Sequence, residues 1–120
     1  MFDDKTILCG ASSYEELFYF NPEFDSLPDA IKDELRIMCV LYTADVGGIL
    51  RLEYDEQGNL NFAVESKEDD FFFDEIGSVL KIKQIQQEKR ELLENLETYY
   101  RVFFLQEDME EHHVNYGGYR

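Results

Sequence analysis

The sequence predicts an α+β fold, in which two β-hairpins form one antiparallel sheet and helices pack on one face of it, in the order β-β-α-β-β-α. Two pairs of short apolar runs are each joined by turn residues, which is the pattern of β-hairpins. Two longer segments repeat apolar residues every three or four positions, which is the spacing of amphipathic helices. Strands and helices of this kind form packed layers around one core.

The first hairpin is expected to pair Thr6–Ala11 with Glu16–Phe20. Both runs are rich in apolar residues, and the short stretch Ser12–Tyr14 joins them. Asn21 and Pro22 then form a turn signal that ends the second strand. The second run shows no strict alternation of apolar and polar residues, so the sequence does not decide which face of that strand is buried.

The first helix is expected to begin after Ser26, which can cap it together with Asp29 three residues later. Pro28 fits the first turn, because its missing N–H group has no helical partner there. Gly47 and Gly48 end the helix, since glycine adopts the left-handed conformation that follows a helical C-terminus. The second half is apolar on nearly all sides, which predicts a central helix. The regular stripe consists of Leu27, Ile31, Leu35, Met38 and Tyr42.

The second hairpin has the clearest strand pattern, with apolar and polar residues alternating in both strands. The loop Asp55–Asn59 supplies an acceptor at its start and a glycine near its end. An EF-hand is excluded, because Leu60 stands where that motif needs glycine and Ser66 where it needs glutamate. The residues expected to face the core are Leu50, Leu52, Tyr54, Leu60, Phe62 and Val64.

A long C-terminal helix is expected from Asp74, as its cap, to about Leu105, since neither glycine nor proline follows Gly77 in this stretch. Its 32 residues would span about 48 Å at about 1.5 Å per residue. A compact domain of 120 residues is only about 35 Å across. The helix therefore either bends or breaks near Gly77, or it extends beyond its own domain and packs on something else.

Along this helix an apolar stripe recurs at alternating steps of three and four, the spacing of a seam between two helices. Lys89 interrupts the stripe. A polar residue at such a seam position can fix the register of a helix pair. The alternative is that the stripe covers the chain's own sheet. The candidate interface consists of Ile82, Ile85, Lys89, Leu92, Leu96, Tyr99 and Phe103.

The formal net charge of −16 is unevenly placed along the chain. Met1–Glu75 holds 5 basic and 19 acidic residues, whereas Ile76–Leu105 holds 5 basic and 4 acidic ones. So acidic a surface repels phosphate backbones and anionic lipids, which argues against nucleic-acid and membrane partners. The charge is explained first by solubility, and a basic protein partner is the alternative interpretation. The nearly neutral helix allows two copies to approach each other there.

The chain is expected to form one α+β domain over residues 1–105, followed by an acidic tail over residues 106–120 that has no apolar period. Asp3 and Asp4 stand where a signal peptide would be basic. The longest wholly apolar run, Ile37–Tyr42, is far shorter than a membrane span. A cytoplasmic location is therefore expected, with Cys9 and Cys39 as reduced, buried thiols.

Neither a catalytic site nor a cofactor or metal site is evident in the sequence. The two histidines, His112 and His113, are adjacent in the tail and fix no coordination geometry. Cys9 has no histidine near it in the chain that could act as its base. Phosphate-binding glycine motifs are missing as well. Whether the protein is an enzyme stays open, with the sequence favouring a non-enzymatic role.

One surface-like motif, "EDDFFFDE", places Phe71–Phe73 between acidic residues. Three exposed phenylalanines could dock in a groove on a partner. The sequence favours the other interpretation, that all three are buried, because a small domain needs their volume in its core.

Three segments, "DDKTILCG", "IMCVLYTADVGGILRLEYDEQGNL" and "FDEIGSVLKIKQIQQEKRELLENLE", resemble a family of short uncharacterised proteins from anaerobic gut Firmicutes. The resemblance covers roughly Met1–Gln106 and leaves the tail outside. It implies a cytosolic bacterial protein, and it lends no catalytic or binding residues.

Together these observations predict a non-enzymatic protein–protein interaction module that forms a homodimer through its C-terminal helix. The first alternative is an acidic inhibitor or immunity-type protein that binds a basic partner. The second alternative is an enzyme whose site a single sequence does not reveal.

Overall fold

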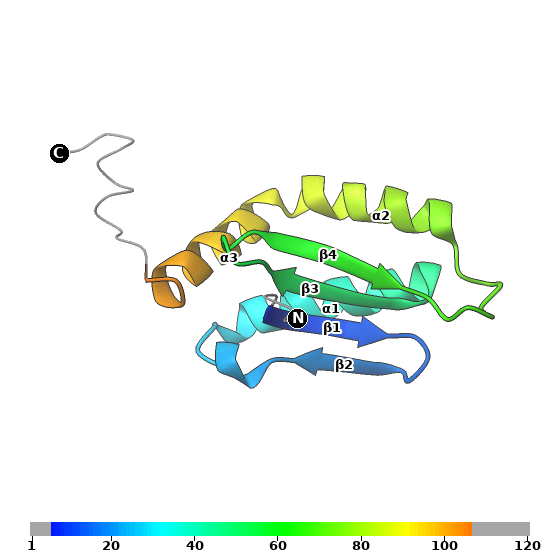
Figure 1. The fold of residues 1–120 in the computed structure, drawn as a ribbon, viewed down its shortest axis with the longest axis horizontal. Coiled ribbons are helices and arrows are strands. Elements are labelled where there is room, and N and C mark those ends of the chain that lie inside the picture. Colours follow the sequence, from blue (N-terminus) through cyan, green and yellow to red (C-terminus); the bar gives the residue numbers. More distant parts are fainter. Residues whose placement is uncertain (1–5, 107–120) are drawn as a thin grey trace.

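A computed structural model describes residues 6–106. In chain order the elements are β1 (Thr6–Ser12), β2 (Leu17–Phe20), a short 3-10 turn (Pro22–Phe24), α1 (Asp29–Val46), β3 (Ile49–Tyr54), β4 (Leu60–Glu65), α2 (Glu75–Glu88) and α3 (Arg90–Phe103). Figure 1 shows α1 behind the sheet and α2 along its β4 edge. The predicted α+β class, with two hairpins flanking a first helix, is confirmed.

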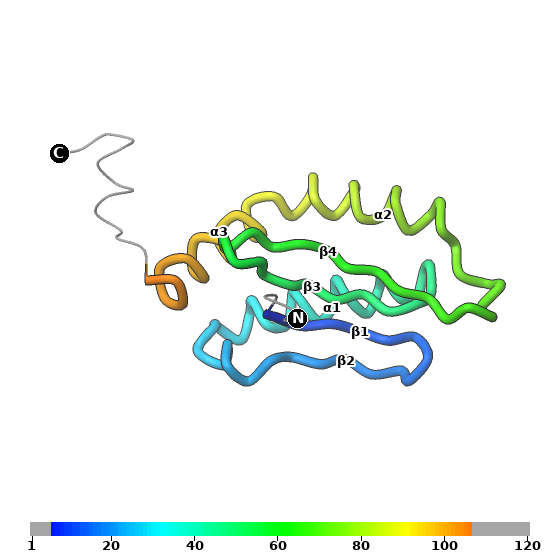
Figure 2. Tube along the Cα trace, in the orientation of Figure 1, coloured from blue at the N-terminus to red at the C-terminus, as the bar shows by residue number. Residues whose placement is uncertain are grey.

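The four strands form one antiparallel sheet in the order β2-β1-β3-β4. Each hairpin pairs its own strands, and β1 pairs with β3 to join the two hairpins. The trace in Figure 2 shows that α1 carries the chain from the β2 edge back to β3. In this register Cys9 lies opposite Leu52, and Leu52 opposite Phe62. These three residues therefore share one face of the sheet, because opposed residues point to the same side.

The helices cover this face, and the core lies between the two layers. Tyr42 of α1 is hydrogen-bonded to Ser78 of α2, so the two helices meet. The Tyr54 hydroxyl of β3 donates to the Leu96 carbonyl of α3 at 2.9 Å, which ties α3 to the sheet. The largest fully buried side chains are Tyr42, Tyr54, Phe24, Leu8, Leu35, Leu50 and Leu52.

The predicted C-terminal helix is two helices, α2 and α3, with a break at Lys89. The sequence left the continuity of this helix open, and the break lies at Lys89, away from Gly77. Lys89 leaves helical geometry at φ −109° and ψ 23°, although neither glycine nor proline is nearby. Tertiary packing accounts for the break, because Ile85 of α2 is buried beside α1, whereas the Leu96 carbonyl of α3 accepts a hydrogen bond from Tyr54 of the sheet.

The start of α1 also differs from the expectation. Pro28 is the residue that precedes the first turn, and no side chain caps it. Ser26, the predicted cap, instead shares a hydrogen bond with the Tyr99 hydroxyl at 3.1 Å. The predicted end is confirmed, since Gly47 and Gly48 have φ values of +84° and +76°, which favour glycine.

The turn between β3 and β4 is a hairpin turn, as predicted. Asp55 Oδ1 accepts hydrogen bonds from the backbone N–H groups of Gln57 and Asn59, at 3.0 and 2.9 Å. Arg101 of α3 donates to the Gln57 carbonyl at 3.0 Å and to Asn59 Oδ1 at 2.8 Å. The Asp55 oxygens thus hold the turn, and α3 closes over it.

Candidate interaction surfaces

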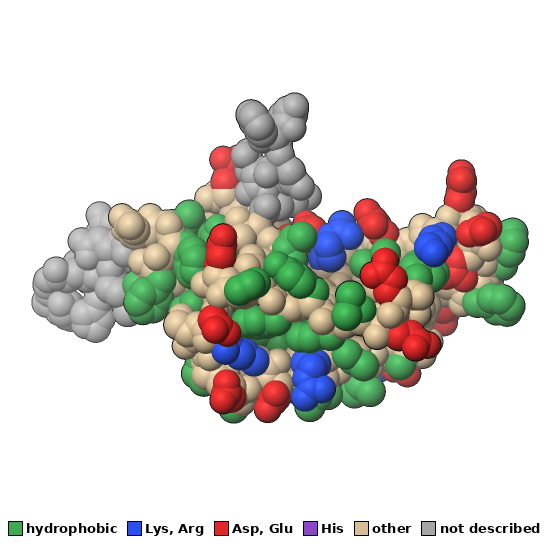
Figure 3. All heavy atoms as spheres, turned by 90° about the horizontal axis from the view of Figure 1, so that it is seen from below, with side chains coloured by type: hydrophobic (Ala, Val, Ile, Leu, Met, Phe, Trp, Pro, Cys, Tyr) green, Lys and Arg blue, Asp and Glu red, His purple; other side chains and the backbone are tan. Residues whose placement is uncertain are grey.

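The loop between β4 and α2 carries two phenylalanines that are almost fully exposed. Phe71 is 89% exposed and Phe72 is 96% exposed, so the expectation that both are buried is wrong. Apolar side chains protrude at this end of the molecule, on the right in Figure 3. We call residues 67–74 the aromatic tip. The third phenylalanine, Phe73, is partly buried and packs against the core, so the expectation is confirmed in part for this residue.

A side chain from the first hairpin holds the outer part of the aromatic tip. The Tyr14 hydroxyl donates to Asp70 Oδ2 at 2.6 Å and accepts from the Lys67 backbone N–H at 2.9 Å. Asp70 Oδ1 in turn accepts from the Phe72 backbone N–H at 3.0 Å. These bonds lower the pKa of Asp70, first through Tyr14 and then through Phe72. The same contact with Asp70 is the main reason why the pKa of Tyr14 is raised.

The inner part of the aromatic tip is fixed at the start of α2. The Asp74 backbone N–H donates to the Val46 carbonyl at 3.2 Å, and the Asp74 carboxylate caps α2 by accepting from the Gly77 N–H at 2.9 Å. The Phe73 ring lies over Gly48, where an added Cβ would approach it to 2.8 Å. Glycine is required there both for this close approach and for its positive φ. The two exposed rings are therefore carried by a turn that is fixed at both ends.

The aromatic tip is strongly acidic. Lys67 is its one basic residue, and the ammonium group lies 4.6 Å from the centre of the Tyr14 ring. The acidic residues in and beside the tip are Glu68, Asp69, Asp70, Asp74 and Glu75. A surface that joins exposed aromatic rings to a negative rim complements an apolar pocket with a positive rim.

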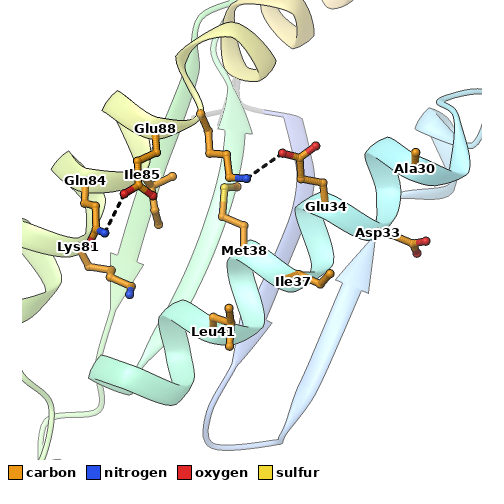
Figure 4. Close-up of a pocket in the computed structure, with 11 residues that line it drawn as sticks. Ala30, Asp33, Glu34, Ile37, Met38, Leu41, Lys81, Gln84, Ile85 and Glu88 are labelled. Atoms are coloured by element: carbon orange, nitrogen blue, oxygen red, sulfur yellow. Dashed lines mark hydrogen bonds and ion pairs between the residues drawn. The ribbon is translucent and has the colours of Figure 1, made fainter.

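A groove of about 560 Å³ lies between α1 and α2, and we call it the helix groove. Ion pairs join the two helices, Lys81 to Asp45 at 2.7 Å and Lys89 to Glu34 at 2.9 Å. Figure 4 shows the side chains of both helices around the groove, with the Lys89–Glu34 contact at one side. Its apolar lining consists of Ala30, Ile37, Met38, Leu41 and Ile85, and its polar lining of Asp33, Glu34, Lys81, Gln84, Glu88 and Lys89.

The helix groove depends on a second apolar face of α1. The inner face of this helix packs on the sheet through residues such as Leu35 and Cys39, as predicted. Ile37, Val40 and Leu41 are exposed instead, so the helix is not central on all sides. The sequence signal for this face is the run "IMCVLY", whose apolar residues exceed what one buried stripe can use.

The residues predicted to form a seam with a second copy lie mostly against the chain's own core. Ile85 and Leu96 are buried, and Ile82, Leu92 and Tyr99 pack on the core cluster. Lys89 makes the ion pair with Glu34 on α1. Phe103 is 68% exposed and is the member of the set that faces solvent most. The structure thus uses this stripe within the chain, which was the alternative interpretation.

The reactive groups that the sequence singled out do not form a catalytic constellation. Cys9 and Cys39 are both buried, with their Sγ atoms 3.9 Å apart. The pKa of the Cys9 thiol is raised, chiefly by its hydrogen bond with Cys39 and also by burial, so its nucleophilic thiolate form is disfavoured. Residues 6–106 contain no group of three His, Cys, Asp or Glu side chains placed to hold a metal ion. His112 and His113 lie outside the described residues.

Every helix within residues 6–106 is too short or too polar to cross a membrane.

Comparisons with known proteins add one finding. Residues 5–108 match a family described as a family of unknown function, DUF6145. Searches among curated proteins and among solved structures find no match to the chain.

Proposed function

Because the chain belongs to DUF6145, a family of unknown function, we propose a function from its geometry: a non-enzymatic interaction module that docks its aromatic tip into an apolar pocket on a basic protein. The observation that carries this proposal is the exposure of Phe71 and Phe72 on a turn that is itself held in place. We place this activity in the cytoplasm, where buried thiols such as Cys9 and Cys39 stay reduced.

The exposure of the two rings has an energetic meaning. Burying one phenylalanine side chain contributes about 1.5–3 kcal/mol, and the fold forgoes this gain at Phe71 and Phe72. A floppy loop could expose such residues by default. This turn is fixed by Tyr14 on one side and by Asp74 on the other, so less conformational entropy is lost when a partner covers the rings.

The charge around the rings defines the partner. Acidic residues precede and follow Phe71 and Phe72 in the chain, and Lys67 is the single basic residue of the tip. A pocket with an acidic rim would be disfavoured by like-charge repulsion, and a neutral rim would gain no electrostatic attraction. A basic rim would speed association at low salt, and this effect would weaken as salt screens the charges. An inhibitor of a basic partner is one form that this function can take.

The test is site-specific photo-crosslinking in cells that naturally produce the protein. Benzoylphenylalanine replaces Phe72 in one variant. In the matched control it replaces Leu17, which is 56% exposed at the start of β2. We expect one defined adduct with a basic protein from position 72 and none from position 17. Wild-type protein should compete for this adduct, whereas a Phe71→Ser/Phe72→Ser double variant should not. No adduct at position 72, or equal competition by the double variant, would refute the proposal.

A further inference from the structure

We propose that a second copy of this chain covers the helix groove, so that Ile37 and Leu41 of each protomer pack into the groove of the other about a two-fold axis. This self-interface differs from the aromatic tip and does not depend on the function proposed for the tip. It also differs from the predicted seam, because α1 supplies the residues at its centre.

The apolar side chains of the helix groove are placed for contact with another helix. Ile37 and Leu41 are one helical turn apart on α1 and are both about half exposed, so they form one ridge along the helix. Met38 and Ile85 line the groove beside this ridge and are buried. Ridges of this kind pack into the grooves of a facing helix. In a two-fold symmetric dimer the same surface patch of both protomers forms the interface. The ridge of each protomer then packs into the groove of the other.

Electrostatics favour a second copy at this place over other parts of the surface. Residues 6–106 contain 9 basic and 21 acidic side chains, so two copies repel each other in most orientations. The lining of the helix groove is nearly balanced, with three acidic and two basic residues. Both of these lysines, Lys81 and Lys89, are paired within the chain. The groove therefore joins exposed apolar surface to a low local charge.

The same comparison disfavours self-association through the aromatic tip. Two tips brought together would oppose their acidic residues, since Lys67 is the only basic residue in that segment. Like charges directly opposed cost free energy. The tip and the helix groove are thus suited to different occupants, a basic protein and a second copy of this chain.

The test is the molar mass of the full chain, measured by light scattering after size-exclusion chromatography at low and high salt. One chain has a mass of 14.2 kDa, and the wild type is expected at twice this value. Leu41→Glu should halve the mass, because it places a charge at the centre of the contact. Leu17→Glu is the matched control: Leu17 is 56% exposed and Leu41 is 55% exposed, but Leu17 does not line the helix groove. Circular dichroism should show the same fold for both variants, since neither side chain is buried.

A third variant, Phe103→Glu, separates the helix groove from the predicted seam. We expect it to remain dimeric, because Phe103 lies at the end of α3 and does not line the groove. A wild-type mass of one chain at all concentrations would overturn the proposal. Dissociation by Leu17→Glu or Phe103→Glu, with Leu41→Glu still dimeric, would place the interface elsewhere and would overturn it equally.

A second measurement uses oxidation and does not depend on a destabilising charge. In the proposed arrangement the two-fold axis passes beside the ridge, so that Leu41 lies near its own copy at the edge of the partner's groove. Leu41→Cys should therefore form a disulfide-linked dimer under mild oxidation. The native thiols Cys9 and Cys39 are buried and should not interfere. Leu17→Cys serves as the control and should stay monomeric on a non-reducing gel. Equal cross-linking of both variants would indicate random collision and would contradict the proposed interface.

Discussion

The Tyr14 hydroxyl donates a hydrogen bond of 2.6 Å to Asp70, which lies 56 residues later in the chain. This bond connects the turn of the first hairpin to the aromatic tip. Two further hydrogen bonds give the tip a fixed shape. The Tyr14 hydroxyl accepts from the Lys67 backbone N–H, and the Asp70 carboxylate accepts from the Phe72 backbone N–H. The presentation of the two exposed rings therefore depends on a tyrosine that lies outside the loop.

Removing this hydroxyl should loosen the aromatic tip without unfolding the domain. Tyr14→Phe keeps the ring beneath the Lys67 ammonium group but loses both hydrogen bonds. We expect the amides of Lys67 and Phe72 to exchange hydrogen faster, and the free energy of unfolding to change little, because both partners of the bond are partly exposed to solvent. Hydrogen–deuterium exchange with mass spectrometry measures the first effect. Tyr19→Phe, on the open face of the sheet, is the control, and identical exchange in both variants would contradict the role of Tyr14.

The same contact predicts how the aromatic tip responds to acid. The pKa of Asp70 is lowered because the Tyr14 hydroxyl, and then the Phe72 N–H, stabilise its charged form. The contribution of this group to stability is therefore fully present above the ordinary aspartate pKa of about 3.9, and it is lost as the pH falls through the lowered pKa. NMR titration should show a higher pKa for Asp70 in Tyr14→Phe than in the wild type. An unchanged value would show that another group sets it.

The sequence predicted the strands well because their signals are local. Alternation within Leu50–Tyr54 and Leu60–Val64, with a turn between them, corresponds to β3 and β4 within about one residue. The two glycines at the end of α1 were likewise readable, because a left-handed conformation follows directly from residue type. Such features need no knowledge of what packs against them.

The candidate surfaces were less predictable because they depend on contacts between distant segments. The exposure of Phe72 follows from Tyr14 and Asp74 holding the loop away from the core, and no local pattern shows this. The break at Lys89 arises where α2 packs on α1 and α3 turns toward Tyr54. An apolar period that resumes at the same spacing after Lys89 looks the same in one long helix and in two short ones.

The ion pair between Lys89 and Glu34 should contribute little to stability. Both side chains are more than a third exposed, at 36% and 39%, so solvent screens the attraction. A double-mutant cycle of Lys89→Ala and Glu34→Ala, followed by urea unfolding, should give a coupling free energy of about 1 kcal/mol or less. A coupling of several kcal/mol would show instead that this pair determines the position of the break.

The contact of Tyr54 with α3 should matter far more. Tyr54 is fully buried, its ring stacks on Tyr100 with 4.0 Å between centroids, and its hydroxyl donates to the Leu96 carbonyl. Tyr54→Phe removes only the hydrogen bond and should cost about 1 kcal/mol. Tyr54→Ala also leaves a cavity between β3 and α3 and should cost about 3–5 kcal/mol. Urea unfolding checks both values, and equal losses for the two variants would mean that the ring packing contributes nothing.

The two native thiols should resist chemical labelling until the domain unfolds. Cys9 and Cys39 are completely buried, and the pKa of Cys9 is raised by its hydrogen bond with Cys39 and by desolvation. Since only the thiolate attacks a disulfide reagent, a higher pKa and a closed core both slow the reaction. Labelling with such a reagent at mildly alkaline pH should therefore proceed at the rate of unfolding and become rapid in urea. Leu17→Cys supplies an exposed thiol for comparison. If the native cysteines reacted as fast as this control in the absence of urea, the contact between β1 and α1 would have to open far more readily than its packing indicates.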